Sequence, residues 1–219
     1  MTMTVKRILF IRPGETDWNR AGKQQGIVAA PLNALGKKQA DKLATFIRVL
    51  GDVAMYASTT KRAAETAQII AERLGSQPII DDRLRERSVG HWQGLTVAEI
   101  KAWYADEYAE LQSVGDTYRI PGGDSRADVQ ARMTTAIDDI LKNSASETVL
   151  VISHTTAIKM ALRALIADVE AQMDDLTNTS VTTIARDGEG GAWRLIALDD
   201  VSHLEGMETQ SVVEPEDKS

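Results

Sequence analysis

Short apolar runs and amphipathic stretches alternate along this chain, a pattern that predicts buried strands separated by helices. The runs at 5–11, 53–57 and 149–152 are rich in strand-forming residues, and each is followed by polar residues. Between and after these runs, apolar residues recur at helical spacing. The predicted helices cover the ranges 40–50, 63–74, 129–141 and 157–165.

The order of these elements predicts an α/β fold. Strand, helix, strand, helix implies a parallel sheet with right-handed crossovers. Further strands are expected at 181–184 and 193–198, with a brief apolar step at 78–80 and a mostly helical insertion over 95–120. Gly51 is expected to end the first helix, and Ser125 or Asp124 to cap a later one.

Length and composition indicate a single globular domain over 1–204, followed by an acidic, disordered tail over 205–219. The net charge of -7 argues against a nucleic-acid partner. No apolar run has the length of a membrane span, and the first apolar run is too short for a secretory signal. Cysteine is absent, which excludes disulfides and thiolate chemistry. We therefore expect a cytoplasmic protein with no membrane partner.

Polar side chains gather where three predicted strands end. Arg12 and Glu15 follow the first strand, Ser58 follows the second with Arg62 just beyond, and His154 follows the third. The carboxyl ends of parallel strands lie at one edge of a sheet, which is where ligands bind in such folds. These residues are thus expected to converge.

The residues Arg12-Pro13-Gly14-Glu15-Thr16, with Asn19 shortly after, resemble the signature of the histidine phosphatase superfamily, the phosphoglycerate mutase-like proteins. That signature reads Arg-His-Gly-Glu/Gln-Thr, so its nucleophilic histidine falls on Pro13. Other matching residues occur in order along nearly the whole chain. They are Gln25-Gly26, Ser58, Arg62-Ala63, Thr66-Ala67, Glu86, Gly90, Trp92, Gly94, Gly122-Gly123-Asp124-Ser125 and Ser153-His154.

The resemblance implies a three-layer α/β/α sandwich and a role for each matched residue. Arg12, Arg62 and His154 would surround a phosphoryl group. Asn19 would contact the phosphate, and Glu86 would protonate the leaving oxygen. The family's chemistry implies no metal and no cofactor.

Pro13 decides how this site is interpreted. The family's reaction passes through a phosphohistidine, and proline offers no nucleophile. Losing a nucleophile costs on the order of a millionfold in turnover in a serine protease. Arg12, Arg62 and a protonated His154 would still form a cationic pocket. The leading hypothesis is a pseudoenzyme that binds phosphate or a small phosphomonoester.

Three alternatives stay open, and so does the natural ligand. In one, water replaces the imidazole and Glu86 or His154 acts as base. In another, the pocket is vestigial and the protein is a scaffold or homodimer, with Trp103, Tyr104, Tyr108 and Tyr118 of the insertion as a contact surface. In the third, Pro13 is an introduced change. Packing or surface roles are expected for His91, His203, Trp18 and Trp92, and the Gly122-Gly123 pair is expected to form a turn.

Overall fold

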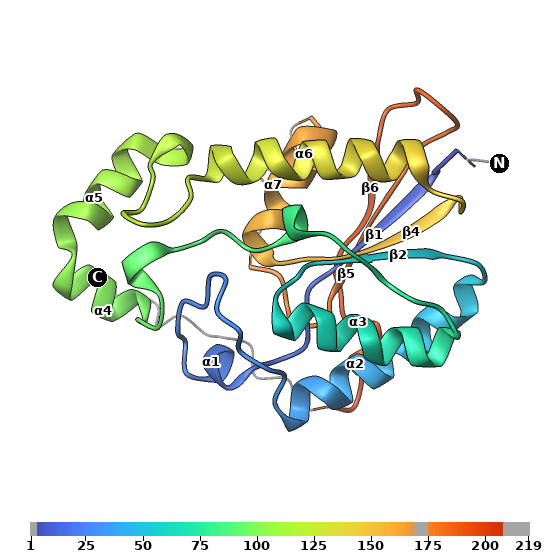
Figure 1. The fold of residues 1–219 in the computed structure, drawn as a ribbon, viewed down its shortest axis with the longest axis horizontal. Helices are drawn as coiled ribbons and strands as arrows, with labels where there is room; N and C mark the ends of the chain where they lie inside the picture. The colour runs from blue at the N-terminus through green and yellow to red at the C-terminus, as the bar shows by residue number, and fades with distance from the viewer. Residues whose placement is uncertain (1–3, 168, 170–174, 208–219) are drawn as a thin grey trace.

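The chain is organised around a six-stranded, mostly parallel sheet (Figure 1). The computed structural model describes residues 4–167, 169 and 175–207. The strands are β1 (Arg7–Ile11), β2 (Ala54–Ala57), β3 (Ile79–Ile80), β4 (Thr148–Ile152), β5 (Val181–Ala185) and β6 (Arg194–Asp200). They lie in the order β3-β2-β4-β1-β5-β6. The first four pair in parallel, whereas β5 is antiparallel to β1 and β6.

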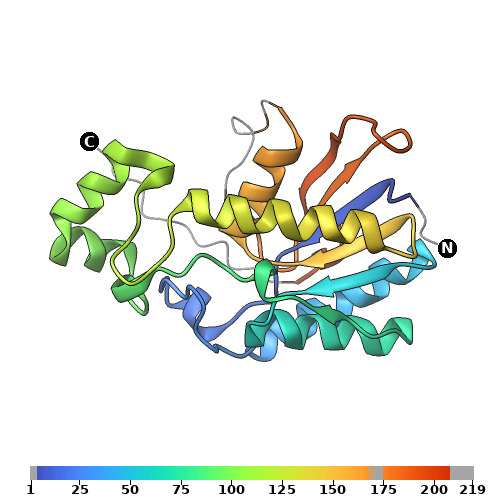
Figure 2. The same cartoon turned by 45° about the horizontal axis from the view of Figure 1, so that its top comes forward.

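Helices cover both faces of this sheet (Figures 1 and 2). The helices α2 (Ala34–Ile47) and α3 (Lys61–Leu74) lie on one face. The helices α6 (Arg126–Asn143) and α7 (Thr155–Leu165) lie on the other. The expected α/β class with a mostly parallel sheet is confirmed.

The side chains of β1 show how the apolar run produces these layers. Successive side chains of a strand point to opposite faces. Ile8 and Phe10 join the core beneath α6 and α7. Leu9 and Ile11 join the core beneath α2 and α3. Because both faces are covered, the strand is apolar at every position from Ile8 onward.

The helix predicted over 40–50 begins earlier than expected. It starts at Ala34, because the side chain of Asn33 accepts a hydrogen bond from the backbone N–H of Gly36 and so caps it. A 3-10 turn over Arg48–Leu50 follows the helix, and Gly51 ends it with φ +77°. The N-cap of α6 is Ser125, as one of the two alternatives had it.

The predicted insertion is helical and has a small core of its own. It contains α4 (Val97–Trp103) and α5 (Ala105–Val114), which lie at one end of the molecule (Figure 1). Tyr118 is buried in the insertion's apolar cluster, and Tyr104 and Tyr108 pack against that cluster. Trp103 alone of the four aromatic residues is exposed, at 64%. Packing therefore accounts for three of the proposed contact residues.

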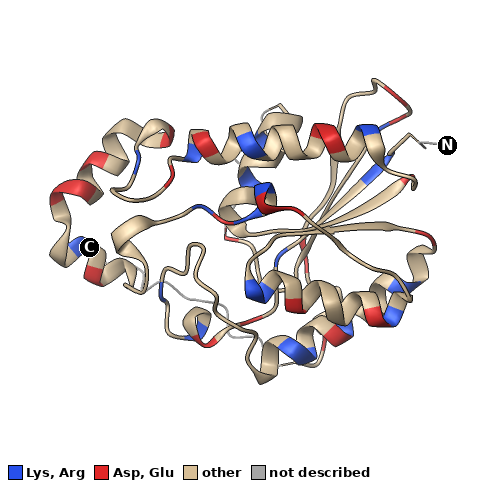
Figure 3. Ribbon diagram, in the orientation of Figure 1, with Lys and Arg blue, Asp and Glu red and all other residues tan. Residues whose placement is uncertain are grey.

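Charge and hydropathy add little to this architecture. Acidic and basic residues are interspersed along α2, α3 and α6 (Figure 3). Among the described residues, no helix has both the length and the apolar character needed to cross a membrane. Of the predicted acidic tail, residues 205–207 are described, and 208–219 lie outside the described residues.

A short helix that the sequence did not predict, α1 (Asp17–Arg20), follows the first polar motif.

Candidate phosphate site

The three polar strand ends meet as predicted. β2, β4 and β1 are adjacent parallel strands, so Ser58, His154 and Arg12 leave the sheet at the same edge. The hydroxyl oxygen of Ser58 lies 2.9 Å from Nε2 of His154. The charge of Arg12 also affects the ionisation of His154 and Arg62. This arrangement follows from topology, because the residues come from distant parts of the chain.

Arg12 and Pro13 are held by the segment that leads into β5. The backbone N–H of Arg12 donates to the carbonyl of Ser180 at 3.2 Å, and its guanidinium donates to the carbonyl of Leu176. The carbonyl of Pro13 accepts a hydrogen bond from Nδ2 of Asn178 at 2.9 Å. Pro13 itself is buried and has no backbone N–H to satisfy. A proline is therefore compatible with this strand exit, as expected.

Two glycines allow the first motif to lie directly on the start of α2. A Cβ atom on Gly14 would come within 2.5 Å of the carbonyl oxygen of Gly36. A Cβ atom on Gly36 would come within 2.1 Å of the carbonyl oxygen of Glu15. Glu15 is buried here and accepts hydrogen bonds from Asn33 and Arg20. Glu15 is thus part of the packing between the motif and α2.

Arg62 lies in the first turn of α3 and is 5% exposed. Its guanidinium donates to the carbonyl of Gly26 at 2.8 Å and to that of Val28 at 3.3 Å. Burial lowers the pKa of Arg62 to about 10, with the positive charge of Arg12 adding to the effect and the carboxylate of Glu86 opposing it. Arg62 stays cationic at neutral pH.

His154 is the N-cap residue of α7 and is almost fully buried. Its Nε2 atom lies 2.9 Å from Oγ of Ser58 and 3.0 Å from Oγ1 of Thr60. Burial lowers its pKa well below 6.5, and the positive charges of Arg62 and Arg12 lower it further. The expectation of a protonated His154 is therefore wrong for the protein without a bound anion. The arginines make the site cationic, and the imidazole is neutral.

Glu86 faces this cluster from the loop that precedes the insertion. Its carboxylate accepts hydrogen bonds from the backbone N–H of Arg87 at 2.7 Å and from that of Thr156, in the first turn of α7, at 3.1 Å. The same carboxylate raises the pKa of both Arg12 and Arg62. The structure thus brings Glu86 into electrostatic contact with the arginines that the resemblance pairs with it.

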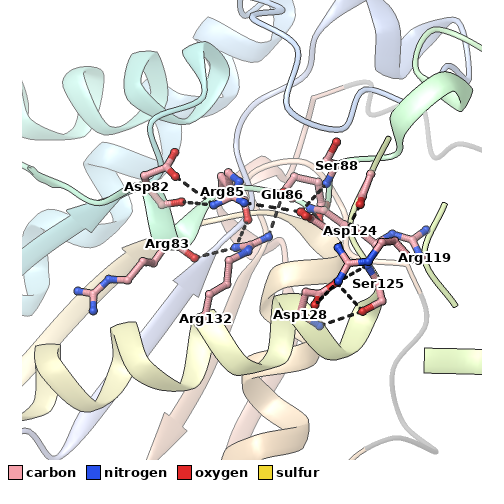
Figure 4. Close-up of polar contacts among 12 residues, drawn as sticks. Asp82, Arg83, Arg85, Glu86, Ser88, Arg119, Asp124, Ser125, Asp128 and Arg132 are labelled. Carbon is pink, nitrogen blue, oxygen red and sulfur yellow. Dashed lines mark hydrogen bonds and ion pairs between the residues drawn. The ribbon is translucent and has the colours of Figure 1, made fainter. Parts of the chain in front are cut away.

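The loop around Glu86 is held from α6, which the sequence did not predict. Arg132 donates hydrogen bonds to the carbonyls of Arg83, Arg85 and Glu86 at 2.7, 2.6 and 3.0 Å (Figure 4). Farther along the loop, the carboxylate of Asp124 accepts from the backbone N–H of Ser88 at 3.1 Å. Arg132 occupies a partly buried face of its helix, so periodicity alone gave no signal for this role.

Asn19 is linked to Pro13 through the side chain of Asn178 and makes no hydrogen bond to Arg12 or Arg62 in the described part of the chain. Its side-chain oxygen accepts from the backbone N–H of Thr16, and the two residues form a capping box. Nδ2 of Asn178 lies between this oxygen, at 3.5 Å, and the carbonyl of Pro13, at 2.9 Å. Its predicted phosphate contact stays a prediction.

Asn178, which contacts Pro13, is a further residue that the sequence reasoning missed. An antiparallel strand begins at the edge where its neighbour ends, so the residues before β5 necessarily meet those after β1. That signal was present in the expected strand over 181–184. Using it required knowing that β5 pairs with β1 in the antiparallel direction.

The residues predicted to be structural pack as expected. Trp92 is buried in the core of the insertion. Nδ1 of His91 lies 3.2 Å from the carbonyl oxygen of Pro121, and its ring packs against Tyr104. No group of three or more potential ligand side chains in the described residues is placed to hold a metal ion.

Comparison with known proteins defines the class of protein to which this site belongs. The family model of the histidine phosphatase superfamily, branch 1, matches residues 8–199, and the chain belongs to this superfamily. It is 35% identical over 201 residues to phosphoglycerate mutase-like protein 4 of Arabidopsis thaliana, an alignment covering 90% of this chain and 86% of that protein. It is 34% identical over 208 residues to the metal-independent phosphoserine phosphatase of the same plant, covering 93% and 85%.

Solved structures give the same result. A mycobacterial glucosyl-3-phosphoglycerate phosphatase in complex with VO3 superposes with a TM-score of 0.79 at 28% identity. The match covers 89% of this chain and 99% of that one. Bacillus stearothermophilus YhfR superposes with a TM-score of 0.78 at 32% identity, covering 91% and 99%. The phosphoglycerate mutase-like fold is thus shared along nearly the full length of both structures.

Proposed function

We propose that this protein is a histidine phosphatase superfamily member that binds phosphate or a small phosphomonoester and does not turn it over efficiently. The observation that carries the proposal is Pro13. It occupies the exit of β1 directly between Arg12 and Gly14, where the superfamily signature has its histidine. A pyrrolidine ring has no lone pair with which to attack phosphorus, so the covalent route is lost.

The surviving arginines support anion binding. Within the described residues, hydrogen bonds occupy two of the five guanidinium N–H donors of Arg62 and one of those of Arg12. The remaining donors lie in a buried, cationic setting, where charge-assisted hydrogen bonds to phosphate are strongest. Phosphatase relatives and a vanadate complex in a structural neighbour are consistent with an oxyanion ligand.

The experiment has two parts. Calorimetry with inorganic phosphate and phosphoserine measures binding, and release of p-nitrophenol from p-nitrophenyl phosphate measures turnover beside an active relative. We expect measurable phosphate binding with turnover lower by several orders of magnitude. Turnover within about tenfold of the active relative refutes the proposal. Absence of phosphate binding refutes it too, and favours a scaffold with a vestigial pocket.

One observation favours a second candidate, hydrolysis by water. The carboxylate of Glu86 lies close enough to Arg12 and Arg62 to raise their pKa, which makes it a candidate base, whereas the lowered pKa of His154 makes its imidazole a weak base. Water oxygen would bond to phosphorus as the ester P–O bond breaks. The water proton would pass to the base, and the protonated base would then give that proton to the leaving alkoxide, which becomes the alcohol. Slow turnover that is abolished by Glu86→Gln or His154→Ala supports this candidate, and turnover unchanged by either variant excludes it.

A further inference from the structure

Two residues near Arg12 have an unusual backbone conformation. Thr179 has φ +59° and Asp199 has φ +51°, and in the described part of the chain they are the only residues other than glycine with positive φ. Residues with a β-carbon rarely adopt this conformation, because it costs free energy unless the surroundings enforce it. Both residues belong to the hydrogen-bond network around the 176–180 segment, which is the segment that holds Arg12.

Asp199 fixes this segment through Thr177. One carboxylate oxygen accepts from the backbone N–H of Thr177 at 2.7 Å, and the other accepts from its hydroxyl at 2.8 Å. Farther along the segment, Nε2 of His203 lies 3.1 Å from the hydroxyl oxygen of Thr179. The end of β6 and the turn after it therefore anchor the segment at two points.

The anchored segment determines where Arg12 and Pro13 lie. The carbonyl of Leu176 accepts from the guanidinium of Arg12, and the carbonyl of Ser180 accepts from its backbone N–H. The backbone N–H of Thr179 donates to the carbonyl of Arg12 at 3.1 Å. We infer that Asp199 is a positioning residue for the phosphate site: it holds the 176–180 segment so that this segment directs the guanidinium of Arg12 toward the ligand. The inference rests on the proposed phosphate binding.

The sign of one variant's effect separates positioning from simple electrostatics. The carboxylate of Asp199 is close enough to raise the pKa of Arg12, so it also repels a bound anion. If charge were its only influence, Asp199→Ala would tighten phosphate binding. If it positions Arg12, Asp199→Ala weakens phosphate binding by about tenfold, in spite of the removed negative charge.

Asp199→Asn is the conservative variant. An asparagine can accept from the backbone N–H of Thr177 through Oδ1 and donate to its hydroxyl through Nδ2, so both contacts persist. It should bind phosphate at least as tightly as the unaltered protein. Asp187→Asn is the matched control, because Asp187 pairs with Arg194 on the surface and has no contact with the segment. Thermal unfolding of every variant reports whether the fold is retained.

Phosphate calorimetry is combined with NMR of the Arg12 side chain in the protein without phosphate. The Nε–Hε signal is assigned from its absence in Arg12→Lys, and its order parameter should fall in Asp199→Ala and persist in Asp199→Asn. Unchanged or tighter phosphate binding by a folded Asp199→Ala overturns the inference. If the unaltered protein binds no phosphate, the proposed function fails, and the mobility of Arg12 still decides whether Asp199 positions it. An unchanged order parameter in Asp199→Ala then overturns the inference.

Discussion

The arginines at the sheet edge and the arginine at the start of the Glu86 loop have different kinds of partner. In the described residues, Arg12 and Arg62 form no ion pair with a carboxylate, and backbone carbonyls accept their hydrogen bonds. Arg83 pairs with Asp81 at 2.7 Å and with Asp139 at 2.6 Å, and its side chain is 38% exposed. The difference is also one of ionisation. Burial lowers the pKa of the first two, whereas the two carboxylates raise the pKa of Arg83.

This comparison indicates what each region can do. A buried guanidinium without a carboxylate partner is costly, because desolvation is only partly offset by carbonyl contacts. An incoming anion offsets the rest, so such a group is suited to binding. A surface arginine with two carboxylates already has its counter-charges and has little to gain from phosphate. Substitutions at the two places should therefore give opposite profiles of binding and stability.

The largest effect is expected from restoring the nucleophile with Pro13→His. The carbonyl of residue 13 keeps its hydrogen bond from Nδ2 of Asn178, because residue 13 contributes only its backbone to that bond. Hydrolysis of a phosphomonoester should rise by at least about a thousandfold, with an acid-labile phosphohistidine trapped during turnover. Pro31→His, at an exposed proline, is the matched control and should leave activity unchanged. If the Pro13→His variant folds and binds phosphate but hydrolyses no phosphomonoester, more than the nucleophile is missing.

The next effect concerns the buried arginine. Arg62→Met should weaken phosphate binding by about a hundredfold, because the proposed site would lose a charge-assisted hydrogen-bond donor in a buried setting. Calorimetry with phosphate measures this, with Arg83→Met as the control that removes one positive charge elsewhere. Equal losses in the two variants would mean that general charge, and not a built site, attracts the anion.

The third prediction concerns stability, because Arg132 holds the loop around Glu86. Arg132→Met removes three hydrogen bonds to loop carbonyls and should lower the free energy of unfolding by about 2 kcal/mol. Urea unfolding measures this loss. Arg119→Met is a useful control, since Arg119 pairs with Asp128 at the exposed start of α6. If the free energy of unfolding falls by the same small amount in both variants, the loop does not depend on Arg132.

Particular residues show how far the sequence predicts this site. Arg12, Ser58 and His154 could be brought together from sequence, because each follows a buried run and parallel strands end at one edge. Asn178 and Leu176 could not, since their contacts depend on β5 running antiparallel next to β1. The neutral state of His154 was also beyond the sequence, because it results from burial and from the charges of three arginines, Arg62, Arg12 and Arg132. Arg132 lies on an ordinary amphipathic helix, and only the path of the Glu86 loop gives it a role.

The neutral imidazole makes stability depend on pH. The unfolded chain binds a proton at His154 near its ordinary pKa of 6.5, and the folded chain does so only at lower pH. The stability that comes from keeping His154 neutral is therefore fully present above pH 6.5. It is lost as the pH falls from 6.5 toward the pKa of His154 in the folded state. Urea unfolding across this range should show a smaller loss for His154→Gln than for the unaltered protein. If the free energy of unfolding falls equally steeply with pH in both proteins, His154 is not held neutral.

The smallest effect is expected at the surface arginine that began the comparison. Arg83→Met removes both ion pairs, but these pairs are partly exposed, and solvent screens them. The free energy of unfolding should fall by less than about 1 kcal/mol, and by less still at high salt, since exposed pairs contribute little. Urea unfolding at low and high salt measures this, and phosphate calorimetry should show no change. A loss of unfolding free energy as large as that of Arg132→Met would make Arg83 a structural support of the loop. The proposed difference between Arg83 and the arginines at the sheet edge would then not hold.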